Sequence, residues 1–398
     1  MGDTEDAGVV ERVRALRPLI RENALRAERG RRVPDEVAAA LTATGVHRVN
    51  VPRRYGGYQT PLRTQVAAFA EIAAECASTA WVTLTQAGVS YIAALYPDDA
   101  QDEFFSGSGS PDARIGGTLI PSARAVPRDD GWLVSGASAF ATGCHHADWH
   151  LLTCVVTTAD GRVPDGPPEL LWAAVPMSEL EILDDWHVTG LAGTGSNTVV
   201  ARDIPVPAHR MLPVGPLLAG EFPSKANAED PFYRMPVLPL FCAWAAPAAL
   251  GLGRAAMREF TGRMRRRGIT YTFHERQHEA TVTHLQLAEA ELKVSGAELM
   301  AGRLTAEIED KARTGAPYSD TERARIRAES GYLTRLCKEA VDLLAAAAGA
   351  SSLHEDVPMQ RITRDIHALA LHSFVNPATN LEIFGRVLAG VDPGTPFL

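Results

Sequence analysis

Residues 123–140 read ARAVPRDDGWLVSGASAF, in which apolar and polar residues alternate on both sides of an RDDG sequence at residues 128–131. This pattern is typical of two β-strands joined by a hairpin turn. Other short β-rich runs, separated by glycine, proline and aspartate, extend from about residue 113 to residue 213. Several short strands at this spacing favour a small β-barrel or sandwich. This stretch decides the fold, because it places a β-domain inside a chain that is otherwise helical.

Helical patterns flank the β-rich region on both sides. Before it, apolar residues recur at helical spacing and alanine-rich stretches follow. After about residue 230, three long amphipathic or alanine-rich stretches are followed by a fourth, which begins near Gln360 and continues through Phe374. This order favours an up-down four-helix bundle. We therefore expect an α+β, mainly α chain with an N-terminal helical domain (1–112), a middle β-domain (113–213) and a C-terminal four-helix bundle (214–398).

Composition narrows the class of protein. The 398 residues are 46% hydrophobic and carry a formal net charge of -9, which suits a large core and gives no electrostatic basis for binding nucleic acid. No apolar run approaches the roughly 18 residues that span a bilayer. The N-terminus lacks the pattern of a signal peptide, and the cysteines include no C-x-x-C pair. We expect a soluble, cytosolic protein that binds neither nucleic acid nor membrane.

Residues 140–149, FATGCHHADW, concentrate a hydroxyl, a thiol, two imidazoles and a carboxylate. In a strand, consecutive side chains point to opposite faces, so Cys144, His145 and His146 cannot all bind one metal ion. No G-x-S-x-G elbow marks a nucleophile, and Cys144 is more simply interpreted as a small buried hydrophobic residue. Neither a metal site nor a nucleophile with its base is favoured, and we expect no metal.

The glycine-rich sequence GLGRAA at residues 251–256 matches G-x-G-x-x-A. It lies inside a predicted helix rather than after a strand, so a face for close helix packing is the better interpretation. The chain therefore offers no Rossmann motif for NAD(P)H.

The order of the three regions, together with four local motifs, resembles the acyl-CoA dehydrogenase fold over nearly the whole chain. In that family a flavin lies between the β-domain and the bundle, and the threonine of a W-I-T-N-G strand hydrogen-bonds its isoalloxazine ring. The motifs are VPRRYGG (51–57), FATG (140–143), WHVTGLAGTGSNTVVARDIPVPAHR (186–210) and QRITRDIHA (360–368).

Two departures separate the chain from the dehydrogenases. TLIPSARAVPRDDG (118–131) replaces their T-E-P-x-A-G-S-D stretch. LALHSFVNPATN (369–380) has His372 where they have the segment that carries or flanks the catalytic carboxylate. Removal of an α-proton from a thioester needs such a carboxylate. GCHHADW, GTGSN and the histidine after R-D-x-x-A instead resemble the two-component flavin-dependent monooxygenases built on this fold.

This resemblance implies an enzyme that uses O2 and reduced FAD or FMN, delivered by diffusion from a separate NAD(P)H:flavin reductase. It implies a C4a-hydroperoxyflavin that hydroxylates an aromatic or heteroaromatic ring, or N-oxygenates an amino sugar, in a natural-product pathway such as antibiotic biosynthesis. It also implies a homo-oligomer, expected to be a tetramer. An acyl-CoA dehydrogenase or oxidase and a non-catalytic flavin-binding protein are the alternatives.

The resemblance also assigns roles to residues. We expect Thr142 to hold the flavin N5–H, and His372 to orient the hydroperoxide or deprotonate a phenol or amine, with His145 as a third catalytic candidate. Whether His145 or His146 faces the site stays open. The expected cofactor contacts are Phe140, Thr142, Gly143, Trp186, Gly193, Thr194, Gly195, Ser196, Arg267 and Arg364. The expected substrate contacts are Trp81, Gln86, Leu119, His145 and Phe374.

Overall fold

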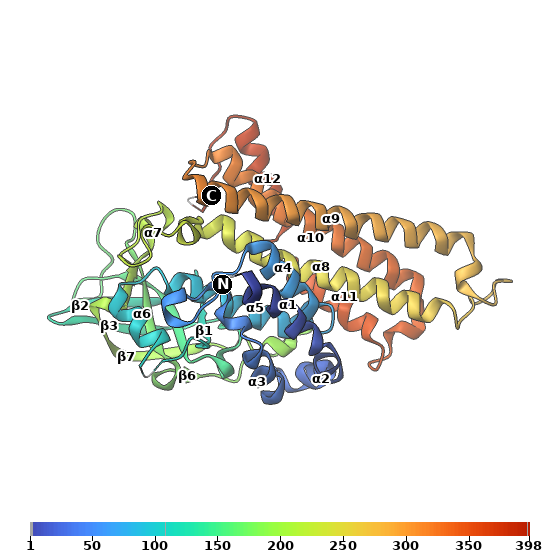
Figure 1. Ribbon diagram of the computed structural model, residues 1–398, viewed down its shortest axis with the longest axis horizontal. Coiled ribbons are helices and arrows are strands. Elements are labelled where there is room, and N and C mark those ends of the chain that lie inside the picture. Colours follow the sequence, from blue (N-terminus) through green and yellow to red (C-terminus); the bar gives the residue numbers. More distant parts are fainter. Residues whose placement is uncertain (1–2, 108, 396) are drawn as a thin grey trace.

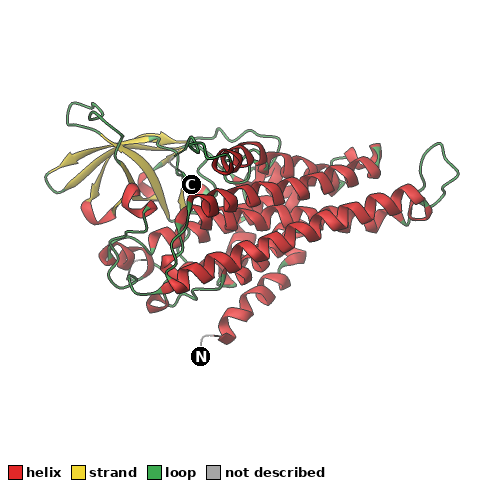
Figure 2. Cartoon of the chain, turned by 90° about the horizontal axis from the view of Figure 1, so that it is seen from above, coloured by secondary structure: helices red, strands yellow, loops and turns green. Residues whose placement is uncertain are grey.

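The computed structural model of the chain describes residues 3–107, 109–395 and 397–398. Helices, then strands, then long helices follow one another along the chain, which confirms the expected α+β, mainly α architecture. The strands gather at one end of the molecule, the long C-terminal helices extend to the other, and the N-terminal helices lie along the junction (Figure 1). The view from above shows the same separation of sheet and bundle (Figure 2).

The described strands form a single eight-stranded sheet. Its order is β6-β7-β3-β2-β4-β5-β8, and β1 pairs in parallel with β4. Arg128 of β2 lies opposite Gly131 of β3, which confirms the predicted hairpin. The sheet has a core of its own, which includes Val134, Leu152 and Ala173. The strands are β1 (Ile115–Gly117), β2 (Ala123–Arg128), β3 (Gly131–Ser138), β4 (Trp149–Val156), β5 (Leu170–Pro176), β6 (Glu181–Ile182), β7 (Val199–Pro207) and β8 (Met211–Pro213).

The helices before the sheet begin and end at residues that favour those boundaries. The first long helical pattern is divided after Ala15, because Pro18 lacks an N–H donor and fits only the first turn of a new helix. Pro34 precedes the next helix, whose first turn carries Asp35 and Glu36 near the positive end of the helix dipole. These helices are α1 (Asp3–Ala15), α2 (Arg17–Gly30), α3 (Asp35–Ala43), α4 (Leu62–Ala73), α5 (Ala77–Ala93) and α6 (Asp98–Phe105).

The C-terminal helices differ from the prediction at one point. The expected fourth bundle helix was to run through Phe374, but it ends at Leu369 and a separate helix begins at Pro377. Asn376 begins the new helix, because its side chain accepts hydrogen bonds from two N–H groups of the first turn, and helical backbone is disfavoured at the residue before a proline. The helices are α7 (Val214–Leu218), α8 (Val237–Met264), α9 (Thr281–Thr314), α10 (Asp320–Ala348), α11 (Pro358–Leu369) and α12 (Pro377–Leu388).

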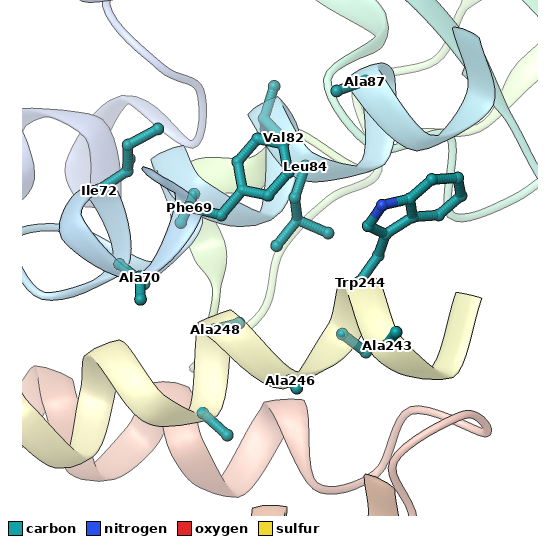
Figure 3. Close-up of a cluster of buried hydrophobic side chains, with 14 of the residues drawn as sticks. Phe69, Ala70, Ile72, Val82, Leu84, Ala87, Ala243, Trp244, Ala246 and Ala248 are labelled. Carbon is teal, nitrogen blue, oxygen red and sulfur yellow. The ribbon is translucent and has the colours of Figure 1, made fainter. Parts of the chain in front are cut away.

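Helix α8 forms the centre of the main core. It is long and apolar enough to cross a membrane, so the expectation that no apolar run approaches this length is wrong. However, 89% of its most apolar window is buried inside the chain, as expected for a core helix. Side chains of α4 and α5, including Phe69 and Leu84, pack against it (Figure 3). A Cβ atom at Gly251 would lie 2.3 Å from the Cβ of Ala73, which confirms that GLGRAA serves close helix packing.

Candidate active site

The segment around Thr142 leaves the sheet instead of continuing as a strand. Strand β3 ends at Ser138, and residues Cys144–His146 form a short 3-10 helix, η3. Phe140 and Gly143 turn the backbone through the left-handed region, at φ 60° and 67°, which is incompatible with an extended strand. The strand expected for this segment, and the alternation argument based on it, are therefore wrong.

A second loop packs directly against this segment. The Ala141 N–H donates to the Asn197 carbonyl at 3.0 Å, and the Gly143 N–H donates to the Thr194 carbonyl at 2.9 Å. The Cys144 thiol donates to the Gly195 carbonyl at 3.3 Å. The FATG segment and the residues 194–197 therefore form one unit, although they are far apart in the sequence.

Three hydroxyls meet where the two loops join. The Thr142 Oγ1 and Ser196 Oγ atoms are 3.0 Å apart, and Ser196 Oγ lies 2.8 Å from Thr194 Oγ1. Thr194 Oγ1 also donates to the Leu191 carbonyl at 2.8 Å. The three side chains are buried, at no more than 7% exposure.

Helix α11 fixes the second loop from behind. The Asp365 carboxylate accepts a hydrogen bond from the Leu191 N–H at 2.7 Å, and Arg364 donates to the Thr189 carbonyl at 2.6 Å. Arg364 also pairs with Glu28 at 2.5 Å. Burial raises the pKa of Asp365 to about 6, while its bond from Leu191 opposes that rise. Gly190 is required here, since a Cβ atom would lie 2.5 Å from the Arg364 carbonyl oxygen.

The cysteine and histidines of η3 have separate structural contacts. Burial raises the pKa of the Cys144 thiol to about 11, so this residue is a buried thiol and not an activated nucleophile. His146 is buried and its Nε2 donates to the Val33 carbonyl at 2.7 Å. His145 is exposed, and its Nε2 lies 3.2 Å from Oδ1 of Asn197. Of the two histidines, only His145 is therefore free to face a bound molecule.

His372 lies in the turn after α11 within an aromatic cluster. Its ring meets Trp81 edge-on, with centroids 5.0 Å apart, and lies 5.5 Å from the ring of Phe374. Phe374 stacks on Phe241 of α8 at 5.4 Å. Desolvation lowers the pKa of His372 to about 4, so the imidazole is neutral at neutral pH. The main-chain N–H of Phe374 donates to its Nδ1 at 3.4 Å, which places the ring proton on Nε2.

Helix α5 connects this aromatic cluster to the Thr142 segment. Trp81 contacts His372, while the next residue, Val82, faces Gly143 so closely that a Cβ atom there would lie 2.6 Å from it. The amide of Gln86 donates to the Gly143 carbonyl at 3.2 Å. Consecutive residues of α5, Trp81 and Val82, thus contact His372 and the Gly143 backbone beside Thr142.

Phe140 and Trp186 supply features that fit a planar heterocycle. Phe140 is 57% exposed and has a strained left-handed backbone, and its ring meets Trp186 edge-on at 6.0 Å. The buried Nε1 of Trp186 has no hydrogen-bond partner among the described residues. An exposed aromatic face, an indole donor without a partner and the Thr142 hydroxyl together suit a flavin ring, which has both apolar faces and polar edges.

Three further residues were predicted to contact the cofactor or the substrate, and each has other surroundings in the structure. Leu119 is half-buried after β1 and packs on the main core. Gly193 lies against Ala27 and Ser78. Helix α8 ends at Met264, at the bundle end remote from the strands (Figure 1). Arg267 follows this end and donates to the Ala348 carbonyl. Within one chain Arg267 does not join the Thr142 cluster, and its cofactor role stays a prediction.

The sequence analysis assigned no role to three residues that the structure places in the candidate site. Asp365 was recognised only as part of the arginine-aspartate motif, and its buried position next to Leu191 was the signal in the structure. Asn197 positions His145 and donates to the Leu183 carbonyl at 2.6 Å. Phe241 extends the aromatic cluster, but nothing in the local sequence distinguished it from other apolar residues of α8.

Comparison with known proteins identifies the family. The acyl-CoA dehydrogenase N-terminal domain matches residues 9–106, and the acyl-CoA dehydrogenase C-terminal domain matches residues 243–377. The FADH(2)-dependent resorcinol hydroxylase, oxygenase component, of Rhizobium sp. (strain MTP-10005) is 31% identical over 97% of this chain and 95% of its own. The chain belongs to the two-component flavin-dependent monooxygenases.

A second relative and a solved structure agree with this placement. The pigment production hydroxylase of Rhodococcus sp. (strain ATCC 21145) is 29% identical over 98% of both chains. The structure of XiaF from Streptomyces sp. in complex with FADH2 and glycerol has a TM-score of 0.91 and 30% identity, covering 99% of this chain and 98% of its own. The protein is therefore a monooxygenase that uses reduced flavin and O2, as the sequence predicted.

Proposed function

We propose that this monooxygenase hydroxylates a small phenolic or related aromatic molecule. The observation that carries the proposal is the position of the neutral His372 imidazole, which contacts Trp81 and Phe374, while Val82, next to Trp81, faces the Gly143 backbone beside Thr142. An aromatic wall of this kind binds planar rings by edge-to-face and stacked contacts. An amino sugar would need polar partners for its hydroxyls, so ring hydroxylation is favoured over N-oxygenation.

The bound reduced flavin would supply two electrons to O2 and, through the C4a-hydroperoxide expected from the sequence, an electrophilic oxygen atom. Thr142, Phe140 and Trp186 would hold the flavin ring. His372, with its proton on Nε2, would donate a hydrogen bond to an oxygen atom between flavin and substrate. A neutral imidazole is suited to this task because it can donate without introducing a buried charge.

The pathway follows from relatives rather than from geometry. One relative is named a pigment production hydroxylase, which supports a role in making an aromatic natural product. The resorcinol hydroxylase relative is named an oxygenase component, which supports supply of reduced FAD or FMN by a separate NAD(P)H:flavin reductase. We propose a soluble, cytosolic enzyme with domain boundaries near residues 112 and 213.

A homotetramer is part of the proposal, and the exposed face of α9 supports it. Leu285, Leu292 and Leu299 recur at intervals of seven residues and are 68%, 73% and 77% exposed. The tip between α8 and α9 presents the fully exposed rings of Tyr271 and Phe273. Such apolar surface on a long helix is typical of contacts between subunits.

Anaerobic binding of reduced FMN and reduced FAD, followed by stopped-flow mixing with oxygenated buffer, tests the function. Binding of reduced flavin, slowed reoxidation and incorporation of one atom from 18O2 into a phenol would support it. Thr142→Ala should accelerate unproductive reoxidation, and His372→Ala should lower product formed per flavin oxidised. Reoxidation at the rate of free flavin, together with bleaching of tightly bound oxidised FAD by an acyl-CoA, would contradict it.

A further inference from the structure

The hydroxyls of Thr142, Ser196 and Thr194 form a hydrogen-bonded row, the hydroxyl row, that ends on the Leu191 carbonyl. Its three contacts measure 3.0, 2.8 and 2.8 Å. Buried hydroxyls satisfy their hydrogen-bonding capacity with one another, since an unpaired buried polar group is costly. The hydroxyl row has three hydroxyl hydrogens for three contacts, so each contact receives one hydrogen.

The direction of donation along the hydroxyl row is set at its Leu191 end. A carbonyl oxygen can only accept, so the Thr194 hydroxyl donates to Leu191. Thr194 has then used its hydrogen and must accept from Ser196. Ser196 in turn must accept from Thr142. Any other order would leave two oxygens 2.8 to 3.0 Å apart with no hydrogen between them.

The Leu191 peptide at the end of the hydroxyl row is itself held in place. Its N–H donates to Asp365 at 2.7 Å, and its backbone is left-handed with φ 51°. A non-glycine residue stays in this conformation only where its surroundings hold it there. The carbonyl that receives the Thr194 hydroxyl therefore has a fixed orientation, which fixes the order of all three hydroxyls.

We infer that Thr194 and Ser196 are positioning residues that leave the Thr142 hydroxyl as a hydrogen-bond acceptor toward the flavin. The inference rests on the proposed function, in which Thr142 contacts the N5 edge of the ring. Reduced flavin has a donor at N5, whereas oxidised flavin has only an acceptor there. An accepting hydroxyl consequently favours the reduced flavin that must enter over the oxidised flavin that must leave.

This role differs from the contacts expected from the sequence. There, Thr194 and Ser196 are expected to contact the cofactor directly. In the structure both hydroxyls donate their hydrogens within the hydroxyl row. They therefore act on the flavin through Thr142. Their effect is on which redox state binds, so activity alone does not measure it.

The test is the ratio of dissociation constants for oxidised and reduced FMN, measured anaerobically on the full chain. Thr194→Val keeps the shape of the side chain, and the Leu191 carbonyl keeps the Thr194 N–H bond at 3.1 Å. Ser196 would then donate to Thr142, whose hydrogen would turn toward the flavin. We expect the preference for reduced FMN to fall roughly tenfold, about 30 mV in the midpoint potential of bound FMN. The matched variant Thr194→Ser retains the hydroxyl and should keep the preference.

A double mutant shows whether Thr194 acts through Thr142. In a Thr142→Val background, Thr194→Val should leave the ratio unchanged, because the hydroxyl that transmits its effect is gone. Ser196→Ala provides an independent variant with the same expected direction as Thr194→Val. If Thr194→Val does not fold, the Ser196→Ala and Thr142→Val pair gives the same comparison.

The outcomes separate this inference from the proposed function. A wild-type chain that prefers reduced FMN, with Thr194→Val and Ser196→Ala unchanged in that preference, overturns the hydroxyl order while the monooxygenase assignment stands. An equal loss in the Thr142→Val background also overturns it. A wild-type chain that does not bind reduced FMN or reduced FAD contradicts the proposed function itself.

Discussion

Asp365 on α11 accepts a hydrogen bond from the main-chain N–H of Leu191 at 2.7 Å, across 174 residues of sequence. The contact ties the bundle to the loop that carries Thr194 and Ser196, and so to Thr142. Burial raises the pKa of this carboxyl to about 6. Asp365 is buried and joins the bundle to this loop. The geometry of the loop and the stability of the chain therefore depend on the same residue.

Asp365→Asn should stabilise the chain at neutral pH. The folded chain holds the Asp365 proton more tightly than the unfolded chain, so stability falls as pH rises from about 4 to about 6 and stays reduced above that. The shift corresponds to about 3 kcal/mol at most. Asparagine still accepts the Leu191 N–H without a charge. Urea unfolding from pH 4 to 8 should therefore show a flatter profile for Asp365→Asn, whereas Asp365→Ala, which loses the acceptor, should be less stable throughout.

His372→Asn and His372→Ala should separate hydrogen bonding from packing. With its pKa lowered to about 4, His372 stays neutral above about pH 5, so hydroxylation should show no titration of this residue between pH 6 and 8. Loss of the donor in His372→Ala should lower the yield of hydroxylated product by about a hundredfold relative to peroxide released. Asparagine should restore part of that yield. A titration near pH 6.5 that disappears in His372→Ala would contradict this assignment.

His150→Leu should make the chain more resistant to acid. His150 is fully buried in β4, neither ring nitrogen has a partner among the described residues, and desolvation lowers its pKa to about 4. The unfolded chain binds this proton more tightly, so the stability contributed by the neutral ring is complete above about pH 6.5. It is lost as pH falls toward 4, by about 3 kcal/mol. Leucine removes this loss and buries no polar atom.

The buried His47 provides a control for the acid prediction. Its pKa is also lowered to about 4, chiefly by burial. Part of the acid sensitivity should therefore persist in His150→Leu. Thermal melting at pH 4.5 and pH 7.5 measures the difference. An unchanged difference between the two pH values would show that His150 is not buried as a neutral ring in the folded chain.

Leu292→Glu should dissociate the proposed tetramer. A carboxylate placed in the middle of the Leu285–Leu292–Leu299 stripe would be buried without a partner in a helix-to-helix contact between subunits. Sedimentation velocity should show a smaller species with unchanged helicity. Leu353→Glu is the matched control, since Leu353 is also 73% exposed but lies outside α9. A wild-type chain that sediments as a monomer would remove the basis for this prediction.

The sequence alone determined the order of the three regions, and the reason is local. Alternation with the RDDG turn specifies β2 and β3, and helical spacing specifies α8, α9 and α10, because each pattern depends on near neighbours in the chain. The same locality explains the errors. The separate helix α12 depends on the cap at Asn376, and the exit of the FATG segment from the sheet depends on the left-handed backbone of Phe140.

The site could be predicted only in part. Motifs predicted roles for Thr142 and His372, but how the two segments lie depends on α5, where Trp81 contacts His372 and Val82 faces Gly143. Tertiary structure also decided which of the η3 histidines is buried in an internal hydrogen bond, since His146 donates to the Val33 carbonyl. The bond from Leu191 to Asp365 and the order of the hydroxyls were likewise invisible in the sequence. They arise from groups brought together by packing, whose donors and acceptors must be satisfied once water is excluded.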